Sequence, residues 1–171
     1  VTFGLRVANW TLPLARAHRD LQALRHAGLP VQLGGASGDL SAMGPDGSAV
    51  AKALAEKLGL APAPPWMAER WPLMRIAGTL AGLLGALEKI GADVMLSTRS
   101  EVGELRLSAA GGSSTMPQKQ NPVAAETLIA LTRHAAALST QITTAPAHAE
   151  ERDGAAWMGE WLVLPPFFTA C

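Results

Sequence analysis

The sequence predicts an all-α fold built from long helices that pack as a bundle. Apolar residues make up 49% of the chain and tyrosine is absent. Ala and Leu outnumber the β-branched Val, Ile and Thr, which favours helix over strand. A heptad pattern in the middle of the chain is typical of a helix in a bundle. Its positions are Ile76, Leu80, Leu83, Leu87, Ile90 and Val94.

The first element is a helix over residues 3–27. Leu14, His18 and Leu21 keep helical spacing, and Gly28 is a suitable C-cap. We expect Pro13 to kink this helix or to mark its first turn, because proline lacks the N–H that a helix interior needs.

Residues 28–45 read as a loop, because the stretch 34–39 holds three glycines that tolerate positive φ. A short helix over 45–58, closed by Gly59, is expected next. The stretch 61–66 contains three prolines and predicts a connector without helix.

The apolar heptad pattern predicts a long helix over 66–107. Gly78, Gly82, Gly85 and Gly91 lie inside it, and each costs about 1 kcal/mol relative to alanine. We expect such glycines where neighbouring helices approach closely.

A break over 109–121 separates this helix from the next, which we expect to begin with Asn121 as N-cap and Pro122 in its first turn. Its buried face is predicted at Leu128, Leu131, Ala135 and Leu138, and its end near 145–146. A last helix is expected from about residue 155 to the prolines at 165–166.

Composition excludes several classes of protein. The chain has 14 basic and 14 acidic residues and no net charge, which argues against a nucleic-acid partner. The sole cysteine, Cys171, excludes an internal disulfide and fits a reducing compartment, so we expect a cytoplasmic protein. No apolar run is long enough for a membrane span. The four histidines are scattered, which argues against a metal site.

Length and charge content bear on organisation. The 171 residues suit one domain. Charged residues are only 16%, against about 25% in typical domains, so we expect part of the apolar surface to meet a partner subunit or further chain. The first residues contain neither an initiator methionine nor a signal-peptide pattern, and the last residues resemble an interrupted sequence. We therefore expect residues 1–171 to be a single helical domain from a longer subunit that lacks its N- and C-terminal parts here.

The stretch 111–122 carries the chemistry. A Gly/Ser loop that leads into a helix start offers backbone N–H groups that can cradle an anion. Lys119 adds a positive charge, Asn121 an amide donor, and an adjacent serine is a candidate base if its alkoxide is stabilised. A plain Gly/Ser linker between two helices is the alternative.

Residues 112–121, GSSTMPQKQN, resemble the Gly-Ser-Ser-x-x-Pro-x-Lys-x-Asn signature of the fumarase/aspartase superfamily and match each of its fixed positions. The resemblance implies a long-helix bundle, the central domain of that superfamily, in a homotetramer whose active sites combine three subunits. It also implies elimination from, or addition to, a carboxylate compound, with no cofactor, metal, nucleic acid or membrane.

Within the superfamily, several stretches resemble the bacterial 3-carboxy-cis,cis-muconate cycloisomerases. They are the glycine-rich turn at 33–38, LEKIG at 87–91, SSTMP at 113–117 and AAWMGEW at 155–161. This implies interconversion of a small tricarboxylate with a carboxymuconolactone, in the catabolism of aromatic acids through protocatechuate.

The resemblance also implies residue roles. Ser113 would carry the proton α to a carboxylate, and Lys119 and Asn121 would bind a substrate carboxylate. Ser114 and Thr115 would add loop donors. The general-acid histidine would lie upstream of Val1, so this chain alone would be incomplete.

One departure concerns the run before the last helix. The cycloisomerase branch carries His-Glu-Arg there, whereas this chain has Glu150-Glu151-Arg152, with His148 two positions earlier. Arg152 is a candidate for binding a substrate carboxylate, and a solvated charged turn is the alternative. Another superfamily lyase, such as adenylosuccinate lyase, and a non-catalytic oligomerisation scaffold remain open.

Overall fold

The computed structural model describes residues 1–108, 121–145 and 147–171. These residues form α-helices and one short 3-10 helix, with no strand among them, which confirms the all-α prediction. The helices are α1 (Phe3–Ala27), α2 (Gly47–Leu58), α3 (Trp71–Ser97), α4 (Val123–Thr144) and α5 (Gly154–Ala170); the 3-10 helix is Ser41–Asp46.

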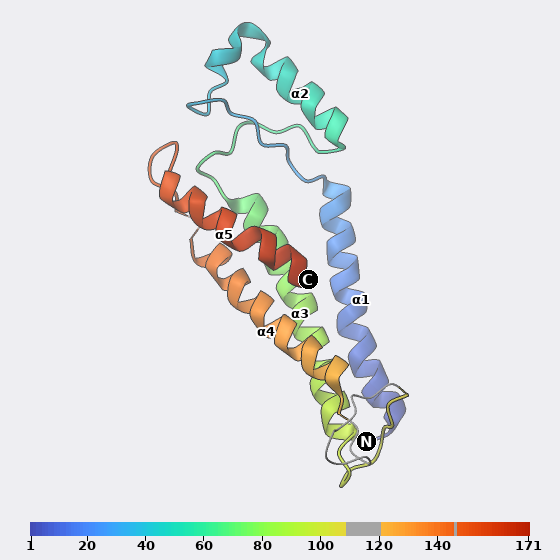
Figure 1. The fold of residues 1–171 in the computed structure, drawn as a ribbon. Coiled ribbons are helices and arrows are strands. Elements are labelled where there is room, and N and C mark those ends of the chain that lie inside the picture. The colour runs from blue at the N-terminus through green and yellow to red at the C-terminus, as the bar shows by residue number, and fades with distance from the viewer. Residues whose placement is uncertain (109–120, 146) are drawn as a thin grey trace.

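Three long helices run side by side, and α3 is antiparallel to both α1 and α4 (Figure 1). α5 packs on α4, and α2 lies apart from the bundle beyond the ends of α1 and α3. The N-terminus of α1, the C-terminus of α3 and the N-terminus of α4 therefore share one end of the bundle. The starts of α3 and α5 lie at the opposite end of the bundle.

The core lies where α3, α4 and α5 meet. Each helix contributes apolar side chains with little or no solvent exposure, and Ala135 and Phe167 are fully buried. The full set is Ala77, Leu84, Ala135, Leu138, Ile142, Val163 and Phe167. Burial of a Leu, Ile or Phe side chain stabilises by about 1.5–3 kcal/mol, so this cluster holds the three helices together.

α1 has the predicted bounds. Thr2 caps it by accepting the Leu5 N–H, Pro13 lies inside it, and Gly28 closes it at φ +79°. A Cβ at Gly28 would lie 2.7 Å from the Ala61 Cβ, because the two connectors run past each other there. Glycine is thus required by both conformation and space.

The predicted bounds of the next two helices need correction. The helix expected from residue 45 begins at Gly47, because Gly44 has a non-helical φ of +61° and the preceding turn is 3-10. The helix expected over 66–107 spans only Trp71–Ser97. Pro72 falls in its first turn, and a tight turn with Gly103 at φ +60° follows its end.

The last two helices also differ from prediction. Asn121 does not cap α4: Pro122 is the cap residue, with a ψ of 56° that is outside the helical range, and no side chain caps the helix there. α5 does not stop at Pro165 and Pro166 but includes both. The fully buried Phe167 follows them, so core packing offsets the two N–H groups that the prolines lack.

Burial on α3 and α4 is shifted from the predicted positions. The heptad residues of α3 are half-buried, and the fully buried positions Ala77, Leu84 and Gly91 lie beside them with the same seven-residue spacing. On α4, Ala135 and Leu138 are buried as predicted, whereas Leu131 is exposed. The pattern located the apolar side of each helix but not the line of contact.

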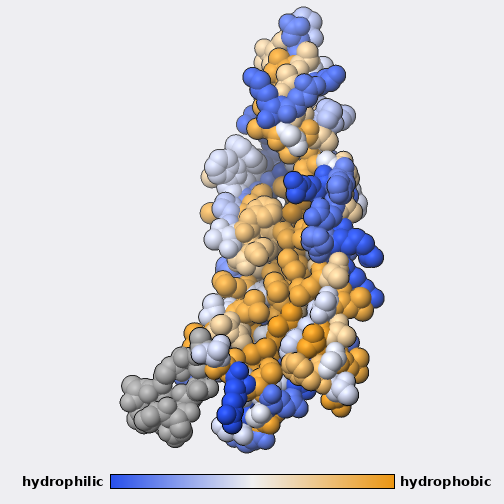
Figure 2. All heavy atoms as spheres, turned by 90° about the vertical axis from the view of Figure 1, so that its right-hand side faces the viewer, coloured by the Kyte–Doolittle hydropathy of each residue, from blue (hydrophilic) through white to orange (hydrophobic). Residues whose placement is uncertain are grey.

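Much apolar surface stays uncovered. Figure 2 shows apolar side chains across the middle of one face. On α5, Trp161 is 63% and Leu162 77% exposed, and the ring of Trp157 packs edge-on against Trp161 on the surface. No helix within the described residues is long and apolar enough to cross a membrane.

Candidate functional site

Most of the predicted catalytic segment lies outside the described residues. This holds for Ser113, Ser114, Thr115 and Lys119. Asn121 and Arg152, the other two predicted site residues, are described, and so are the helices that lead into and out of the segment.

Asn121 lies at the start of α4 and is half-buried. Its carbonyl oxygen accepts the Val123 N–H at 2.9 Å, which forms the tight turn into the helix. This places Asn121 at the bundle end shared with the N-terminus of α1 and the C-terminus of α3 (Figure 1).

A group of side chains ties these helix ends together, and we call Arg6, Ser97 and Glu104 the Arg6 cluster. Arg6 Nη1 donates to Ser97 Oγ at 2.7 Å and to the Glu104 carboxylate. Ser97 is buried, and its carbonyl oxygen accepts the Leu105 N–H at 3.0 Å. The cluster thus fixes the chain that leaves α3 against α1.

A second contact lies one turn away on the same helices. Asp93 Oδ2 accepts Lys89 Nζ and the Trp10 indole N–H, both at 2.7 Å. The hydrogen bond from Lys89, followed by that from Trp10, lowers the pKa of Asp93 below its usual value. Asp93 therefore stays ionised at neutral pH.

Arg152 lies at the opposite end of the bundle, in the turn before α5. Its Nη1 donates to the Ala36 carbonyl at 3.2 Å, and its guanidinium lies 5.8 Å from the Trp157 ring centroid. The 22 residues of α4 separate it from Asn121, which at 1.5 Å per residue amounts to about 33 Å. One chain therefore does not bring Asn121 and Arg152 together.

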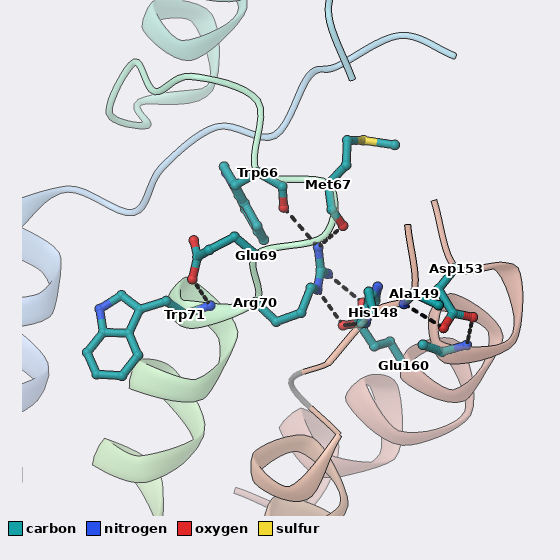
Figure 3. Close-up of polar contacts among 10 residues, drawn as sticks. Trp66, Met67, Glu69, Arg70, Trp71, His148, Ala149, Asp153 and Glu160 are labelled. Carbon is teal, nitrogen blue, oxygen red and sulfur yellow. Dashed lines mark hydrogen bonds and ion pairs between the residues drawn. The ribbon is translucent and has the colours of Figure 1, made fainter. Parts of the chain in front are cut away.

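A buried ion pair organises this second end (Figure 3), and we call Trp66, Arg70, His148 and Glu160 the Arg70 cluster. Arg70 binds Glu160 through two parallel hydrogen bonds of 2.7 and 2.6 Å, and their side chains are only 10% and 15% exposed. A two-pronged Arg–carboxylate pair is strong and directional.

Further contacts link the Arg70 cluster to the connectors. Arg70 Nη1 donates to the carbonyls of Trp66 and Met67, and the guanidinium lies 4.9 Å from the Trp66 ring centroid. Trp66 donates its indole N–H to the Val31 carbonyl at 2.9 Å and its backbone N–H to Gln32 Oε1 at 2.9 Å. The starts of α3 and α5 and two connectors therefore meet at Arg70.

The turn between α4 and α5 closes over this cluster. Glu150 adopts φ +54°, which is uncommon for a residue with a side chain. Asp153 caps α5 through Ala156 N–H at 2.9 Å and also accepts Ala149 N–H at 3.0 Å. These two backbone hydrogen bonds, that from Ala156 first, lower the pKa of Asp153.

A pocket of about 190 Å³ opens beside the turn. Its lining side chains come from the first connector, the segment just before α3, the turn before α5 and the first turn of α5. They are Gln32, Met67, Arg70, His148, Arg152, Asp153 and Trp157. Of the two predicted site residues that the structure describes, Arg152 lines this pocket and Asn121 does not.

The sequence reasoning missed Gln32, Arg70 and Glu160 as members of a polar site. Arg70 and Glu160 are 90 positions apart, and no local motif marks either as a partner of the other. Glu160 lies in the AAWMGEW stretch that resembles a family element, but nothing in that stretch identifies Arg70 as its partner. Within the ranges that the structure covers, no three His, Cys, Asp or Glu residues are grouped as a metal site would need.

Residues 1–136 match the lyase family. A 3-carboxy-cis,cis-muconate cycloisomerase of Pseudomonas aeruginosa is 42% identical over an alignment of 169 positions, which spans 96% of this chain and 37% of that protein. A nitrosuccinate lyase of Streptomyces davaonensis is 38% identical over an alignment of 179 positions with gaps, which spans 95% of this chain and 37% of the relative.

The same similarity holds in three dimensions. The crystal structure of the 3-carboxy-cis,cis-muconate lactonizing enzyme from Pseudomonas putida superposes with a TM-score of 0.89 at 39% sequence identity. The match covers 99% of this chain and 39% of that structure. This chain thus spans less than two fifths of the length of each of these three proteins.

Proposed function

The chain belongs to the lyase family, and we propose that it is the central helical domain of a cycloisomerase. The reaction interconverts 3-carboxy-cis,cis-muconate and a carboxymuconolactone. One observation carries this proposal: a chain that is 42% identical to such a cycloisomerase over nearly its whole length also keeps each fixed residue of the superfamily signature at 112–121.

In the proposed reaction, a carboxylate of the substrate adds to its own double bond and closes a lactone. In the reverse direction Ser113 removes the proton α to a carboxylate, and by reversibility it delivers that proton in lactonisation. Lys119 and Asn121 bind the carboxylate on which negative charge grows in the transition state. The nucleophile is part of the substrate, so its proximity lowers the barrier.

The geometry also supports a site built between copies of the chain. Asn121 and Arg152 lie at opposite ends of α4, so both can contact one small substrate only if they come from different subunits. The exposed Trp161 and Leu162 on α5 offer apolar surface for such packing. A homotetramer is the proposed assembly.

The proton carrier is tested in the complete protein by following the ultraviolet absorbance of 3-carboxy-cis,cis-muconate. Ser113→Ala is expected to lower kcat by about 10²- to 10⁴-fold, the usual contribution of a positioned acid–base group. Ser108→Ala, at an exposed serine outside the signature, is the matched control and should keep wild-type turnover. Unchanged turnover in Ser113→Ala would refute the assigned role.

Assembly between subunits has a separate test. Ser113→Ala and Arg152→Ala variants are each expected to be impaired, and mixing them during refolding should restore part of the activity. Restored activity requires sites that take these two residues from different chains. No recovery from correctly assembled mixed oligomers would contradict the shared site.

A second candidate is a lyase that eliminates from a substituted succinate, which the nitrosuccinate lyase relative favours. It is distinguished by assaying fumarate formation from nitrosuccinate, adenylosuccinate and argininosuccinate. Turnover of one of these, together with none of the muconate, would replace the cycloisomerase assignment.

A further inference from the structure

The pocket beside the turn before α5 holds polar groups that the fold itself does not use. Gln32 accepts the Trp66 N–H through Oε1 at 2.9 Å, but its Nε2 is buried and has no partner among the described residues. Buried amide groups are nearly always hydrogen-bonded, so an unpaired donor in a pocket wall indicates a missing acceptor.

His148 presents the second such group. Its side chain is only 3% exposed, and within the structure as described its Nε2 makes no hydrogen bond. Glu160 Oε1 lies 3.5 Å from His148 Nε2 and already accepts from Arg70 Nε. His148 and Gln32 line the same pocket, from elements more than 100 residues apart in the sequence.

The hydrogen-bonding groups that face this pocket favour a ligand with acceptor oxygens, because unused donors outnumber unused acceptors. Glu160 compensates Arg70 through two hydrogen bonds. The two oxygens of Asp153 each accept a backbone N–H. Arg152, by contrast, donates to one backbone carbonyl and stacks on Trp157. A guanidinium has five N–H donors, so Arg152 keeps hydrogen-bonding capacity for a ligand.

We propose that Gln32 and His148, together with Arg152, form a subsite that binds one carboxylate group of the substrate. Gln32 Nε2 and His148 Nε2 donate to the carboxylate oxygens, and the guanidinium of Arg152 balances the charge. The pocket volume of about 190 Å³ exceeds that of a bound water several-fold and admits a carboxylate with attached carbons. Gln32 and His148 are thus specificity-determining residues for a polycarboxylate.

The identity of the substrate in this inference rests on the proposed function, whereas the carboxylate chemistry rests on the pocket. Because α4 separates the pocket from Asn121, the subsite serves a signature segment supplied by another copy. The subsite thereby binds one carboxylate group of the tricarboxylate, and the signature residues bind another.

Gln32→Glu is the sharpest variant. It keeps an oxygen to accept the Trp66 N–H but replaces the unpaired donor with a second, negatively charged oxygen. The probe is propane-1,2,3-tricarboxylate, and its binding to the complete protein is measured by isothermal titration calorimetry. We expect the Kd of the probe and the KM for the muconate to rise about 10- to 100-fold, with kcat nearly unchanged. Gln141→Glu makes the same change at an exposed site on α4 and should alter neither.

His148→Phe is the second variant, because it keeps an aromatic ring but removes Nε2. It should raise the Kd of the probe by about tenfold, which is the effect of losing one hydrogen bond to a charged group. His134→Phe, at an exposed histidine of α4, is its control. Circular dichroism and thermal unfolding identify any variant that fails to fold.

The outcomes separate the subsite from the proposed reaction. Wild-type affinity for the probe in both folded variants, or no binding of the probe to the wild-type protein, would overturn the subsite, even if the muconate is turned over. Weaker probe binding in Gln32→Glu, found in a protein that does not turn over the muconate, would support the subsite and refute the cycloisomerase.

Discussion

The two ends of the helical bundle are held by different forces. At the end where α3 and α5 begin, the Arg70–Glu160 pair is almost removed from water, with side chains 10% and 15% exposed. At the end near Asn121, the Arg6–Glu104 pair is far more open, with side chains 27% and 50% exposed. Both ends contain an ion pair between an arginine and a glutamate, but the two pairs differ in solvent exposure.

This difference decides how much each pair contributes. A buried charge that loses its partner costs about 3–5 kcal/mol, whereas an exposed ion pair contributes about 0–1 kcal/mol. The end near Asn121 relies instead on close backbone packing, since α3 and α4 approach at Gly91, where a Cβ would lie 2.8 Å from Ile129 Cγ1. Charge pairing thus dominates one end and shape complementarity the other.

The largest effect is expected from Glu160→Gln, which leaves the Arg70 guanidinium buried without its countercharge. The free energy of unfolding of the complete protein, measured with urea, should fall by about 3 kcal/mol or more. Glu88→Gln, which removes the exposed pair with Arg133, is the matched control and should cost less than about 1 kcal/mol. Equal small losses in both variants would remove the contrast between the two ends.

Gly91→Ala tests the close approach of α3 and α4 at the end near Asn121. The added methyl group meets Ile129 Cγ1 at 2.8 Å and the Ala125 carbonyl at 3.2 Å, so stability should fall by about 1–3 kcal/mol. Gly82→Ala in the same helix meets no described atom within 4 Å, and it should be neutral or stabilise by up to about 1 kcal/mol. A comparable loss at Gly82 would mean that another segment or subunit packs there.

Asp93→Ala tests the polar contact between α1 and α3 near the same end of the bundle. It removes the acceptor of Lys89 and Trp10 and should cost about 1 kcal/mol at pH 7. The folded-state pKa of Asp93 is lowered from its ordinary value of 3.8. The stabilisation is therefore complete above that value and disappears as the pH falls through the folded pKa. Urea unfolding of both proteins at several pH values should show the difference closing in acid, and a pH-independent difference would contradict this assignment.

The smallest effect is expected from Glu104→Gln, which removes the charge of the Arg6 partner at the exposed end. The loss in the urea midpoint should correspond to less than about 1 kcal/mol and should shrink further in high salt, because exposed pairs are screened. A loss as large as that of Glu160→Gln would show that the Arg6 cluster is shielded from water in the complete protein.

Local features of the sequence predicted several elements well. The bounds of α1 are those predicted, because Gly28 has the conformational freedom that a helix end requires. The end of α2 at Gly59 has the same explanation. The signature at 112–121 identified the family before any coordinates were considered, since its meaning depends on residue identity and spacing. The predicted end of α5 at Pro165 and Pro166 was wrong, because the burial of Phe167 outweighs the helix-breaking preference of the two prolines.

The candidate site was only partly predictable. Arg152 was identified as a candidate from its place in a run that differs from a family motif, and it lines the pocket together with Gln32 and His148. Gln32 was not identified, and His148 was noted only as a departure from the His-Glu-Arg run, because their proximity depends on two connectors meeting. A polar residue in a loop has no sequence pattern that distinguishes a pocket wall from open solvent.

By itself, the sequence determined the helical class, both ends of α1, the end of α2 and the signature of the family. These depend on interactions within a few residues, such as caps, turns and apolar periodicity. Only the tertiary structure decided that Arg70 pairs with Glu160, that Gly91 alone of the four glycines in α3 contacts α4, and that Asn121 and Arg152 lie at opposite ends. Contacts between distant segments depend on how whole helices pack, and a periodic pattern marks the side of a helix but not its neighbour.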